Sequence, residues 1–563
     1  MKKYFSFDAV FLKGLIVQNW RSGITVALIS IPLSIALSIA SGAGPIPGLI
    51  TGIWATLIAS FLGGNNYNII GAAGALTTVL FAATLAAPLG LGAAVLPLLA
   101  LSTGFLILLI WLIGLDKYLY LIPSSVMYGF AAGVAFLIAA SQLFDATGLS
   151  ALKRTGHFLG DIELYVAHAS ETHINSLLVF AIFLAGILLW KRYIKAMPAV
   201  IPVSIVGIIF GYIESEYLGL GLISLGDKFG DITGALVLPV AWGALEQILA
   251  NKEMIVWILK ISGTIALIAV LETLITAKIA DKITKTQSSS RKELLGLALA
   301  NLGSGAMGGL PATGVFIRTG ANIKAGATHK MSATIAALAT AVIALVVLPF
   351  FIYIPMVVIA AILVNTALGL IEIHRFKEFY VLEKSSFIIA ITVVLITVFE
   401  DAGMAVAIGA IMSLFWFTDQ ISRGRFDAIF NFKDGTKTTV RGAKKLIIPS
   451  EHSISVLTYS ISGLLGYIDS GRHAENFRRI ASAGNIENVI IRLRGLLATD
   501  FEGQEMLGEA VEELEARGKK VYISSASTQV ARELKELPQL ANIMTANRFT
   551  ERTEDALKSI GLH

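Results

Sequence analysis

Residues 308–319 read GGLPATGVFIRT and place a single arginine, Arg318, between long apolar stretches. An arginine in the hydrocarbon region of a membrane is costly, so it is rarely found there without a partner or a ligand. The two glycines and the proline before it weaken a helix, because glycine adds backbone freedom and proline removes a hydrogen-bond donor. The stretch therefore predicts a helix that is interrupted inside a membrane, next to a positive charge.

The composition of the whole chain favours a membrane protein. Of its 563 residues, 55% are hydrophobic and only 15% are charged, whereas soluble domains carry about 25% charged residues. Apolar stretches long enough to span a bilayer, roughly 17–25 residues each, follow one another from about Gly23 to Thr418. The sequence predicts four regions: a cytoplasmic amphipathic segment at 1–21, a transmembrane domain at 22–420, a linker at 421–439 and a soluble domain at 440–563.

Several classes of function find no support in the sequence. The chain has no cysteine, which excludes disulfides, thiolate metal sites and thiol catalysis. Its eight histidines are scattered without metal-ligand spacing, and no phosphate-binding loop or nucleophile elbow is present. The basic residues lie beside apolar stretches, where they orient helices rather than bind nucleic acid. We therefore expect no enzyme, no metal, no cofactor and no nucleic-acid partner.

The apolar stretches form two series of seven elements. The first seven lie near residues 22–40, 46–62, 72–87, 91–113, 123–144, 174–190 and 197–213. The second seven lie near residues 257–279, 294–308, 313–326, 331–350, 355–371, 386–399 and 402–419. An odd number of spans in each series inverts one half relative to the other, and matched interrupted segments in such a repeat indicate a transporter's central site.

The third and tenth elements are the matched pair. Residues 69–80 read IIGAAGALTTVL, and like the tenth element they are too short and too rich in glycine to cross a bilayer alone. The alternative interpretation is a pair of poorly hydrophobic helices that glycine allows to pack closely.

The loop charges predict the orientation. An even number of spans puts both chain ends on one side, and the loops on that side then hold most of the basic residues, including Lys191, Arg192, Lys278, Lys282, Arg375 and Lys384. The longer loops on the other side, about 145–173 and 214–254, carry mainly acidic residues. By the positive-inside rule, we expect a multi-pass protein of the cell's inner (plasma) membrane, with the N-terminus and the soluble domain cytoplasmic.

Two half-helices that meet near the midplane would bring their N-termini together. Unpaired N–H groups and the positive ends of two helix dipoles then form an anion site. The predicted binding residues are Gly71, Ala72, Ala73, Gly74, Thr77, Ala312, Thr313, Gly314, Val315 and Arg318, with Thr78 as a further hydroxyl donor. The alternative for Arg318 is a structural side chain that reaches to the membrane surface.

A second ionisable residue, Glu272, lies within the apolar stretch GTIALIAVLETLITAKIAD at 263–281. A carboxylate inside a membrane span is a functional candidate by default. It could pair with Arg318 in the empty protein, carry a proton, or coordinate a cation together with Thr273 and Thr276. The alternative is a static Glu272–Arg318 ion pair.

Four parts of the sequence together resemble the sulfate permease (SulP) family of anion transporters: GAAG at 71–74, LETLITAKIAD at 271–281, GGLPATGVFIRT at 308–319, and the C-terminal region. The resemblance implies fourteen segments in a seven-plus-seven inverted repeat. A core domain, elements one to four and eight to eleven, would move against a gate domain like an elevator. It also implies an anion between the third and tenth elements and a homodimer.

The C-terminal region resembles a STAS domain, the fold of anti-sigma-factor antagonists. Strands are expected at 487–493 and 520–524 and helices at 503–517 and 527–536, which is an α/β layer. In the loop Asp500-Phe501-Glu502-Gly503, Glu502 takes the position of the serine that is phosphorylated in soluble relatives. Glu502 is therefore a candidate regulatory residue whose charge mimics a phosphate; the alternative is a structural surface acid.

Departures from the family pattern narrow the expected substrate. Ala72 and Ala73 replace a proline and a hydroxyl residue, and Leu33 replaces the glutamine that often follows Pro32. A site with few side-chain donors suits a small inorganic anion, sulfate or bicarbonate, and Glu272 resembles the glutamate of proton-coupled members. The alternatives are a C4-dicarboxylate carrier on the same scaffold, an uncoupled anion channel and a nucleobase permease.

Overall fold

The computed structural model describes residues 9–114, 117, 123–194, 197–232, 236–240, 242–400, 402–422, 425–442, 446–449 and 453–562. The chain forms two compact units, Met1–Ser413 and Leu414–His563. Each unit has its own hydrophobic core, and each is described by itself.

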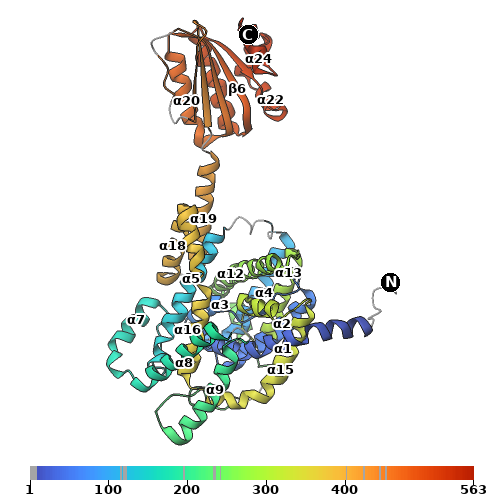
Figure 1. Cartoon of the computed structure of the whole chain (residues 1–563), viewed down its shortest axis with the longest axis vertical. Helices are drawn as coiled ribbons and strands as arrows, with labels where there is room; N and C mark the ends of the chain where they lie inside the picture. Colours follow the sequence, from blue (N-terminus) through green and yellow to red (C-terminus); the bar gives the residue numbers. More distant parts are fainter. Residues whose placement is uncertain are drawn as a thin grey trace. The chain divides into compact units, whose positions relative to one another are not determined.

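Each of the fourteen predicted apolar elements overlaps a helix of the structure (Figure 1). The first series is α1 (Ala9–Ala40), α2 (Pro45–Leu62), α3 (Gly74–Leu85), α4 (Leu96–Ile113), α5 (Ser124–Ser141), α8 (Ile174–Tyr193) and α9 (Val200–Ile213). The second series is α12 (Lys252–Thr284), α13 (Ser290–Ala306), α14 (Phe316–Lys324), α15 (Met331–Val347), α16 (Met356–Leu370), α18 (Lys384–Phe399) and α19 (Ala402–Ser422).

Shorter helices connect these elements. They are α6 (Leu143–Ala146), α7 (Phe158–Ala167), α10 (Leu225–Phe229), α11 (Trp242–Ala250) and α17 (Ile373–Leu382). Single turns lie at Pro88–Gly90, Gly92–Val95, Ala169–Glu171 and Glu214–Leu218, and two turns of 3₁₀ helix at Leu348–Tyr353. Two very short strands, β1 (Ile70–Gly71) and β2 (Thr313–Gly314), precede α3 and α14.

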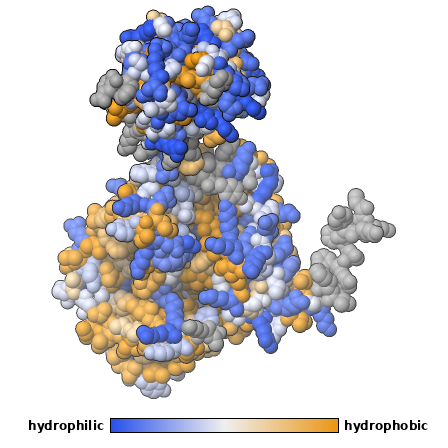
Figure 2. Space-filling view, turned by 45° about the horizontal axis from the view of Figure 1, so that its top comes forward, coloured by the Kyte–Doolittle hydropathy of each residue, from blue (hydrophilic) through white to orange (hydrophobic). Residues whose placement is uncertain are grey.

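The surface of the first unit is that of a membrane protein. Ten helices in the described part of the chain are long and apolar enough to cross a bilayer. Large apolar side chains point outward from them, for example Leu178 and Ile182 on α8 and Val346 on α15. The face shown in Figure 2 carries many hydrophobic residues on this unit, whereas the C-terminal unit is mostly hydrophilic. The protein is therefore a helical, multi-pass membrane protein with a C-terminal α/β domain.

The N-terminal segment differs from the prediction. From Ala9 onward, it is the beginning of α1 and not a separate surface helix, while residues 1–8 lie outside the described residues. The physical reason is Asn19, which is fully buried. Its Oδ1 accepts hydrogen bonds from the backbone N–H groups of Thr328 at 2.9 Å and His329 at 3.1 Å, which tie the segment to the bundle.

The C-terminal unit is a six-stranded sheet with the order β4-β3-β5-β6-β7-β8. Its strands are β3 (Arg425–Phe432), β4 (Lys437–Arg441), β5 (Ile454–Leu465), β6 (Ile486–Thr499), β7 (Lys520–Ser524) and β8 (Phe549–Thr550). Strands β5 to β8 are parallel, and β3 is antiparallel to β4 and β5. Its helices are α20 (Tyr467–Ser482), α21 (Phe501–Ala516), α22 (Thr528–Lys535), α23 (Ala541–Thr545) and α24 (Thr553–Ser559), with a single turn at Pro538–Leu540.

The expected linker at 421–439 needs correction, because β3 and most of β4 lie within it. In β3, alternate residues face the core: Phe426 and Phe430 are fully buried, and they pack with buried residues of the other strands and of α20 and α21. This alternation is the signature of a half-buried strand. The α/β unit therefore includes residues from Arg425 onward, ahead of the predicted start at 440.

Candidate functional site

The two interrupted segments meet in the structure. Strands β1 and β2 pair antiparallel, with Ile70 opposite Gly314 and Gly71 opposite Thr313. The N–H of Val315 donates to the carbonyl of Ile69 at 2.8 Å. Because α3 begins three residues after β1 and α14 begins two residues after β2, both helix N-termini lie beside the β1–β2 pair, the crossing of the two segments.

All the predicted backbone donors at this crossing are buried: Gly71, Ala72, Ala73, Gly74, Ala312, Thr313, Gly314 and Val315. Some of them already have partners in the protein. The N–H of Ala312 donates to Asn301 Oδ1 at 2.9 Å, and the N–H of Gly314 donates to Thr273 Oγ1 at 2.8 Å. These amides build the crossing, so the donors left for a ligand are first-turn N–H groups of α3 and α14. The N–H groups of Leu76 and Thr319 are not among them, because they donate to the carbonyls of Ala73 at 3.3 Å and Val315 at 2.9 Å.

Neither helix is capped by its own side chains. The residues before the first turns, Ala73 and Val315, have extended backbones and no side-chain capping bond. A helix N-terminus in this state carries a partial positive charge and favours an anion.

Arg318, in the first turn of α14, is fully buried. Its Nη2 donates to Ser34 Oγ on α1 at 2.9 Å, while Nε and Nη1 have no hydrogen-bond partner. A Cβ added at Gly71 would lie 2.6 Å from Nη1, so the guanidinium lies directly against β1. No acidic side chain in the described part of the chain forms an ion pair with Arg318. A buried cation without a counter-charge is a strong indication of an anionic ligand.

Glu272, on α12, bonds to Thr313 of β2 and not to Arg318. Thr313 Oγ1 donates to Glu272 Oε2 at 2.5 Å. The neighbouring threonines of α12 hold β2: Thr273 accepts from the N–H of Gly314, and Thr276 Oγ1 donates to the Gly314 carbonyl at 3.2 Å. The Glu272–Arg318 ion pair that the sequence left open is absent from the described residues, and the carboxyl group of Glu272 instead bonds directly to the crossing.

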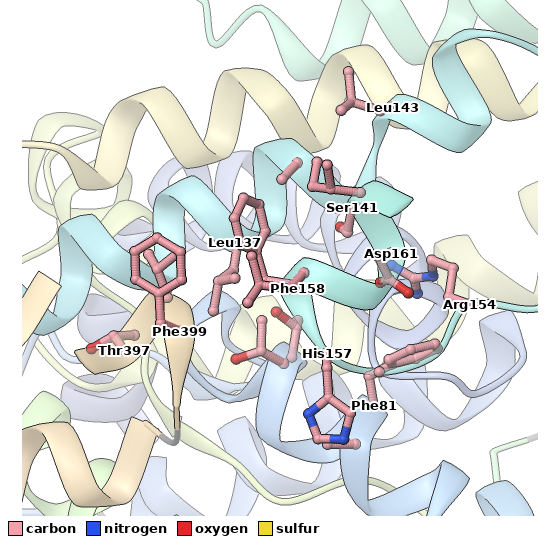
Figure 3. Close-up of a pocket in the computed structure, with 18 of the residues that line it drawn as sticks. Phe81, Leu137, Ser141, Leu143, Arg154, His157, Phe158, Asp161, Thr397 and Phe399 are labelled. Carbon is pink, nitrogen blue, oxygen red and sulfur yellow. The ribbon is translucent and has the colours of Figure 1, made fainter. Parts of the chain in front are cut away.

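The hydroxyl-bearing residues of α3 line a separate cavity of about 520 Å³. Thr77 Oγ1 already donates to the Gly74 carbonyl at 2.8 Å, while the buried Thr78 Oγ1 has no hydrogen-bond partner. Both line the cavity, together with residues of α5, of α7 and of the end of α18 (Figure 3). Of the predicted donors, Thr77 and Thr78 line it, whereas Arg318 of α14 does not.

Arg154 overhangs this cavity from the connection before α7, with its guanidinium 3.8 Å from the centre of the Phe81 ring on α3. Asp161 lies beside it in Figure 3 and accepts from the N–H of Thr155 at 2.6 Å. The cavity wall thus carries both signs of charge and runs along α3 towards its first turn.

Helices α5 and α16 face the two helix N-termini. A Cβ at Gly74 would lie 3.3 Å from Ile138 of α5 and 3.5 Å from Leu370 of α16, and one at Gly369 of α16 would lie 3.9 Å from Ile317 of α14. At Gly74 and Ile317, the contacts of α3 and α14 with α5 and α16 are therefore apolar and involve no hydrogen bonds.

Several polar residues at the crossing are not among the predicted ones. They are Ser34, Thr51, Asn68, Glu293, Asn301 and Thr319, all buried and all hydrogen-bonded around the two segments. The available signal is a polar side chain inside an apolar stretch, which Asn301 provides in α13; Glu293 gives no such signal, because it follows Arg291 and Lys292 at the start of the helix.

The predicted regulatory residue, Glu502, lies in the C-terminal unit. It is exposed in the first turn of α21, whose N-terminus is capped by Asp500: Asp500 Oδ1 accepts from the N–H of Gly503 at 2.8 Å. The second oxygen of Asp500 accepts from the N–H of Tyr467 at 3.0 Å, which joins the beginnings of α20 and α21.

Two interrupted helices that meet beside a buried arginine, inside a bundle of membrane-spanning helices, are typical of the central site of a membrane transporter. A sequence model of the sulfate permease family matches residues 17–393, and one of the STAS domain matches residues 448–556. The chain belongs to the sulfate permease family and carries a C-terminal STAS domain.

Two relatives are named as transporters of different anions, sulfate and bicarbonate. The chain is 27% identical to the putative sulfate transporter YvdB of Bacillus subtilis, over 73% of this chain and 76% of that protein. It is 25% identical to the bicarbonate transporter BicA of Synechocystis sp., over 96% of this chain and 94% of that one.

Solved structures share the fold. The structure of SLC26A9 matches with a TM-score of 0.77 and 15% identity, over 98% of this chain and 91% of that one. The transmembrane domain of a cyanobacterial BicA matches with a TM-score of 0.58 and 24% identity, over 70% of this chain and 97% of that one.

Proposed function

We propose that this protein is a secondary transporter of a small inorganic anion, sulfate or bicarbonate. The anion binds at the first turns of α3 and α14, beside Arg318. The names of the relatives, a putative sulfate transporter and a bicarbonate transporter, support this substrate class.

Arg318 is the residue on which this proposal depends. A fully buried guanidinium with two unpaired nitrogens is unfavourable unless a negative charge joins it. Two uncapped helix N-termini beside it add partial positive charge and N–H donors. An anion neutralises all three at once. The side chains of Ala72 and Ala73 have no hydrogen-bonding groups with which a larger polar solute could be recognised.

The transported anion is coupled to a proton that Glu272 carries. Its carboxyl group accepts from Thr313, which pairs with Gly71 across the crossing. A change in the charge of Glu272 therefore affects both β2 and β1. With a proton on one oxygen of Glu272, the other oxygen can still accept from the Thr313 hydroxyl. The side chain then loses its negative charge and gains a donor, which alters the electrostatic environment of the anion. Thr276 supports this arrangement by holding the Gly314 carbonyl.

Transport itself follows an elevator-like movement of a core, α1 to α4 and α12 to α15, against the remaining membrane helices. The apolar contacts of Gly74 and Ile317 with α5 and α16 support this, because such surfaces can slide without breaking hydrogen bonds. The protein lies in the inner (plasma) membrane as a homodimer, with its STAS domain, including Glu502, in the cytoplasm. The membrane domain spans about 22–420.

A C4-dicarboxylate carrier is the second candidate. The cavity of about 520 Å³ beside α3 is large enough for an organic anion, and Arg154 and Thr78 line it.

Uptake into liposomes tests both candidates. Purified protein is reconstituted, and uptake of sulfate, bicarbonate, chloride and fumarate is measured with and without an inward proton gradient. We expect saturable uptake of sulfate or bicarbonate that the gradient drives uphill. Preferential uptake of fumarate would favour the second candidate, and an electrical current that does not saturate and ignores the gradient would show a channel.

A further inference from the structure

We propose that α13 clamps both interrupted segments, and that Glu293 is the residue that positions them for anion binding. This inference rests on the proposed function, because it concerns the same site. Glu293 touches neither Arg318 nor the first turns of α3 and α14 in the described hydrogen bonds; it acts through the segment before β1.

Glu293 is a buried carboxylate, 2% exposed, and all its hydrogen-bond partners in the described residues are N–H donors. Oε2 accepts from the N–H groups of Gly64 at 2.7 Å and Asn65 at 2.8 Å, and Oε1 accepts from Asn68 Nδ2 at 2.7 Å. Within the described residues no lysine or arginine forms an ion pair with it. Hydrogen bonds to an ionised acceptor are about twice as strong as neutral ones, so the carboxylate fixes the turn at 64–68.

Asn68 passes this restraint on to α14. Its Oδ1 accepts from Thr319 Oγ1 at 3.0 Å, and Thr319 Oγ1 in turn accepts from the N–H of Ile69 at 3.0 Å. Thr319 is the residue after Arg318. A continuous series of hydrogen bonds therefore runs from Glu293 on α13 to the first turn of α14, and it fixes the position of β1 on the way.

The same helix also holds the other segment. Asn301 bonds to both backbone groups of Ala312: Nδ2 donates to its carbonyl at 3.0 Å, and Oδ1 accepts from its N–H at 2.9 Å. Ser304 Oγ donates to the Leu310 carbonyl at 2.7 Å. Positions 293, 301 and 304 lie on one side of a helix, so α13 sets the distance between the two segments.

A close backbone approach keeps this arrangement tight. A Cβ at Gly296 would lie 2.7 Å from the Cα of Gly63 and 2.8 Å from its nitrogen, so only glycine lets α13 approach the start of the first segment this closely. Helix α13 and the segment before β1 therefore behave as one body.

The chemistry requires a carboxylate at position 293 and not an amide. All three partners are donors, so a glutamine side chain would turn its own NH₂ group towards one of them. A buried donor without an acceptor is unfavourable. The Glu293→Gln variant thus keeps the size of the side chain but breaks the clamp at one point.

The experiment uses the full-length protein in three forms: wild type, Glu293→Gln, and the double variant Glu293→Gln/Asn68→Asp. In the double variant, the amide NH₂ group introduced at position 293 donates to the carboxylate introduced at position 68, whose other oxygen still accepts from Thr319. Glu253→Gln, the same substitution at an exposed glutamate, is the control. Two properties are measured: hydrogen exchange of peptides covering 64–71 and 310–316, and KM and maximal rate of sulfate and bicarbonate uptake into liposomes.

We expect Glu293→Gln to accelerate exchange in both peptides and to raise KM about tenfold, which corresponds to about 1.4 kcal/mol, with a smaller change in maximal rate. The double variant should recover at least part of both losses, and Glu253→Gln should match wild type. A purely local structural role would instead lower the amount of active protein and the maximal rate while KM stays constant.

Unchanged hydrogen exchange in Glu293→Gln would overturn the clamp, and faster exchange with an unchanged KM would overturn its link to the anion site. If the wild type takes up neither anion, the proposed function fails, whereas the exchange measurement still decides whether Glu293 holds the two segments. Should Glu293→Gln not fold, Thr319→Val, which removes only the last hydrogen bonds of the series, must raise KM in the same direction; a wild-type KM there contradicts the proposal.

Discussion

Helices α3 and α14 begin at the same two-stranded crossing but carry different side chains in their first turns. α3 starts with Gly74, Ala75 and Leu76, which have no polar side chains, whereas α14 places Arg318 in its first turn. The segment before α3 is held by Glu293, and the segment before α14 by Asn301 and by Thr273.

The comparison separates two contributions to anion binding. Both helices offer N–H groups and the positive end of a dipole, which do not depend on the side chain. Only α14 adds a full charge. We therefore expect substitutions at the N-terminus of α14 to act through charge and those at the N-terminus of α3 to act through shape.

Removal of the Arg318 charge should have the largest effect. Arg318→Ala should reduce kcat/KM for sulfate or bicarbonate uptake by about tenfold to a hundredfold, as loss of a charged hydrogen-bonding group worth about 1.5–3 kcal/mol implies. Arg318→Lys keeps the charge but not the planar group that reaches Ser34, so its loss should be smaller. Normal affinity of Arg318→Ala in liposome uptake would show that the residue is structural.

Glu272→Gln should separate coupling from binding. The glutamine oxygen can still accept from Thr313, so the crossing stays intact, but the side chain no longer carries a proton. We expect accumulation driven by a proton gradient to be lost while exchange of internal for external anion continues. Both are measured in the same liposomes with labelled sulfate; accumulation equal to wild type would refute the coupling role.

The glycines at the crossing provide a shape test. A Cβ at Gly314 would lie 2.9 Å from the Cα of Thr273, a backbone atom that cannot turn aside, whereas one at Gly74 would lie 3.3 Å from the end of the Ile138 side chain. Gly314→Ala should therefore destabilise the protein by about 1–3 kcal/mol, as overpacking does, and lower uptake. Gly74→Ala should have a clearly smaller effect in thermal unfolding and uptake; equal losses would contradict the difference.

Thr77→Val should have the smallest effect. Its hydroxyl already donates to the Gly74 carbonyl within its own helix, so it is not needed to bind the anion. We expect KM to change by less than about threefold, well under the roughly 1.4 kcal/mol of a tenfold change. A large increase in KM would mean that Thr77 turns towards the ligand and that α3 also contributes a side chain.

The apolar helices and the two interrupted elements were predictable, because hydropathy and the paired glycine-rich stretches are local signals. The hydrogen bonds between elements were not. Nothing in the neighbourhood of Glu293 in the sequence indicates that its partners are Gly64, Asn65 and Asn68, more than two hundred residues away.

Other differences have similar causes. The sequence predicts a linker where β3 lies, because the charged residues around it resemble a connection, although the buried Phe426 and Phe430 alternate with partly exposed positions. The backbone amides of Ala312 and Gly314 were expected to face a ligand, but Asn301 and Thr273 accept from them. Whether a backbone N–H group is free to bind a ligand depends on side chains, such as Asn301 and Thr273, that lie near it only in the folded protein.

The position of a bound anion tests the central idea most directly. The protein is crystallised with selenate or bromide, whose anomalous scattering locates the ion, and Arg318→Ala serves as the comparison. We predict one strong peak within hydrogen-bonding distance of first-turn N–H groups of both α3 and α14, and no such peak in the variant. A peak elsewhere in the membrane domain, with the crossing unoccupied, would contradict the account.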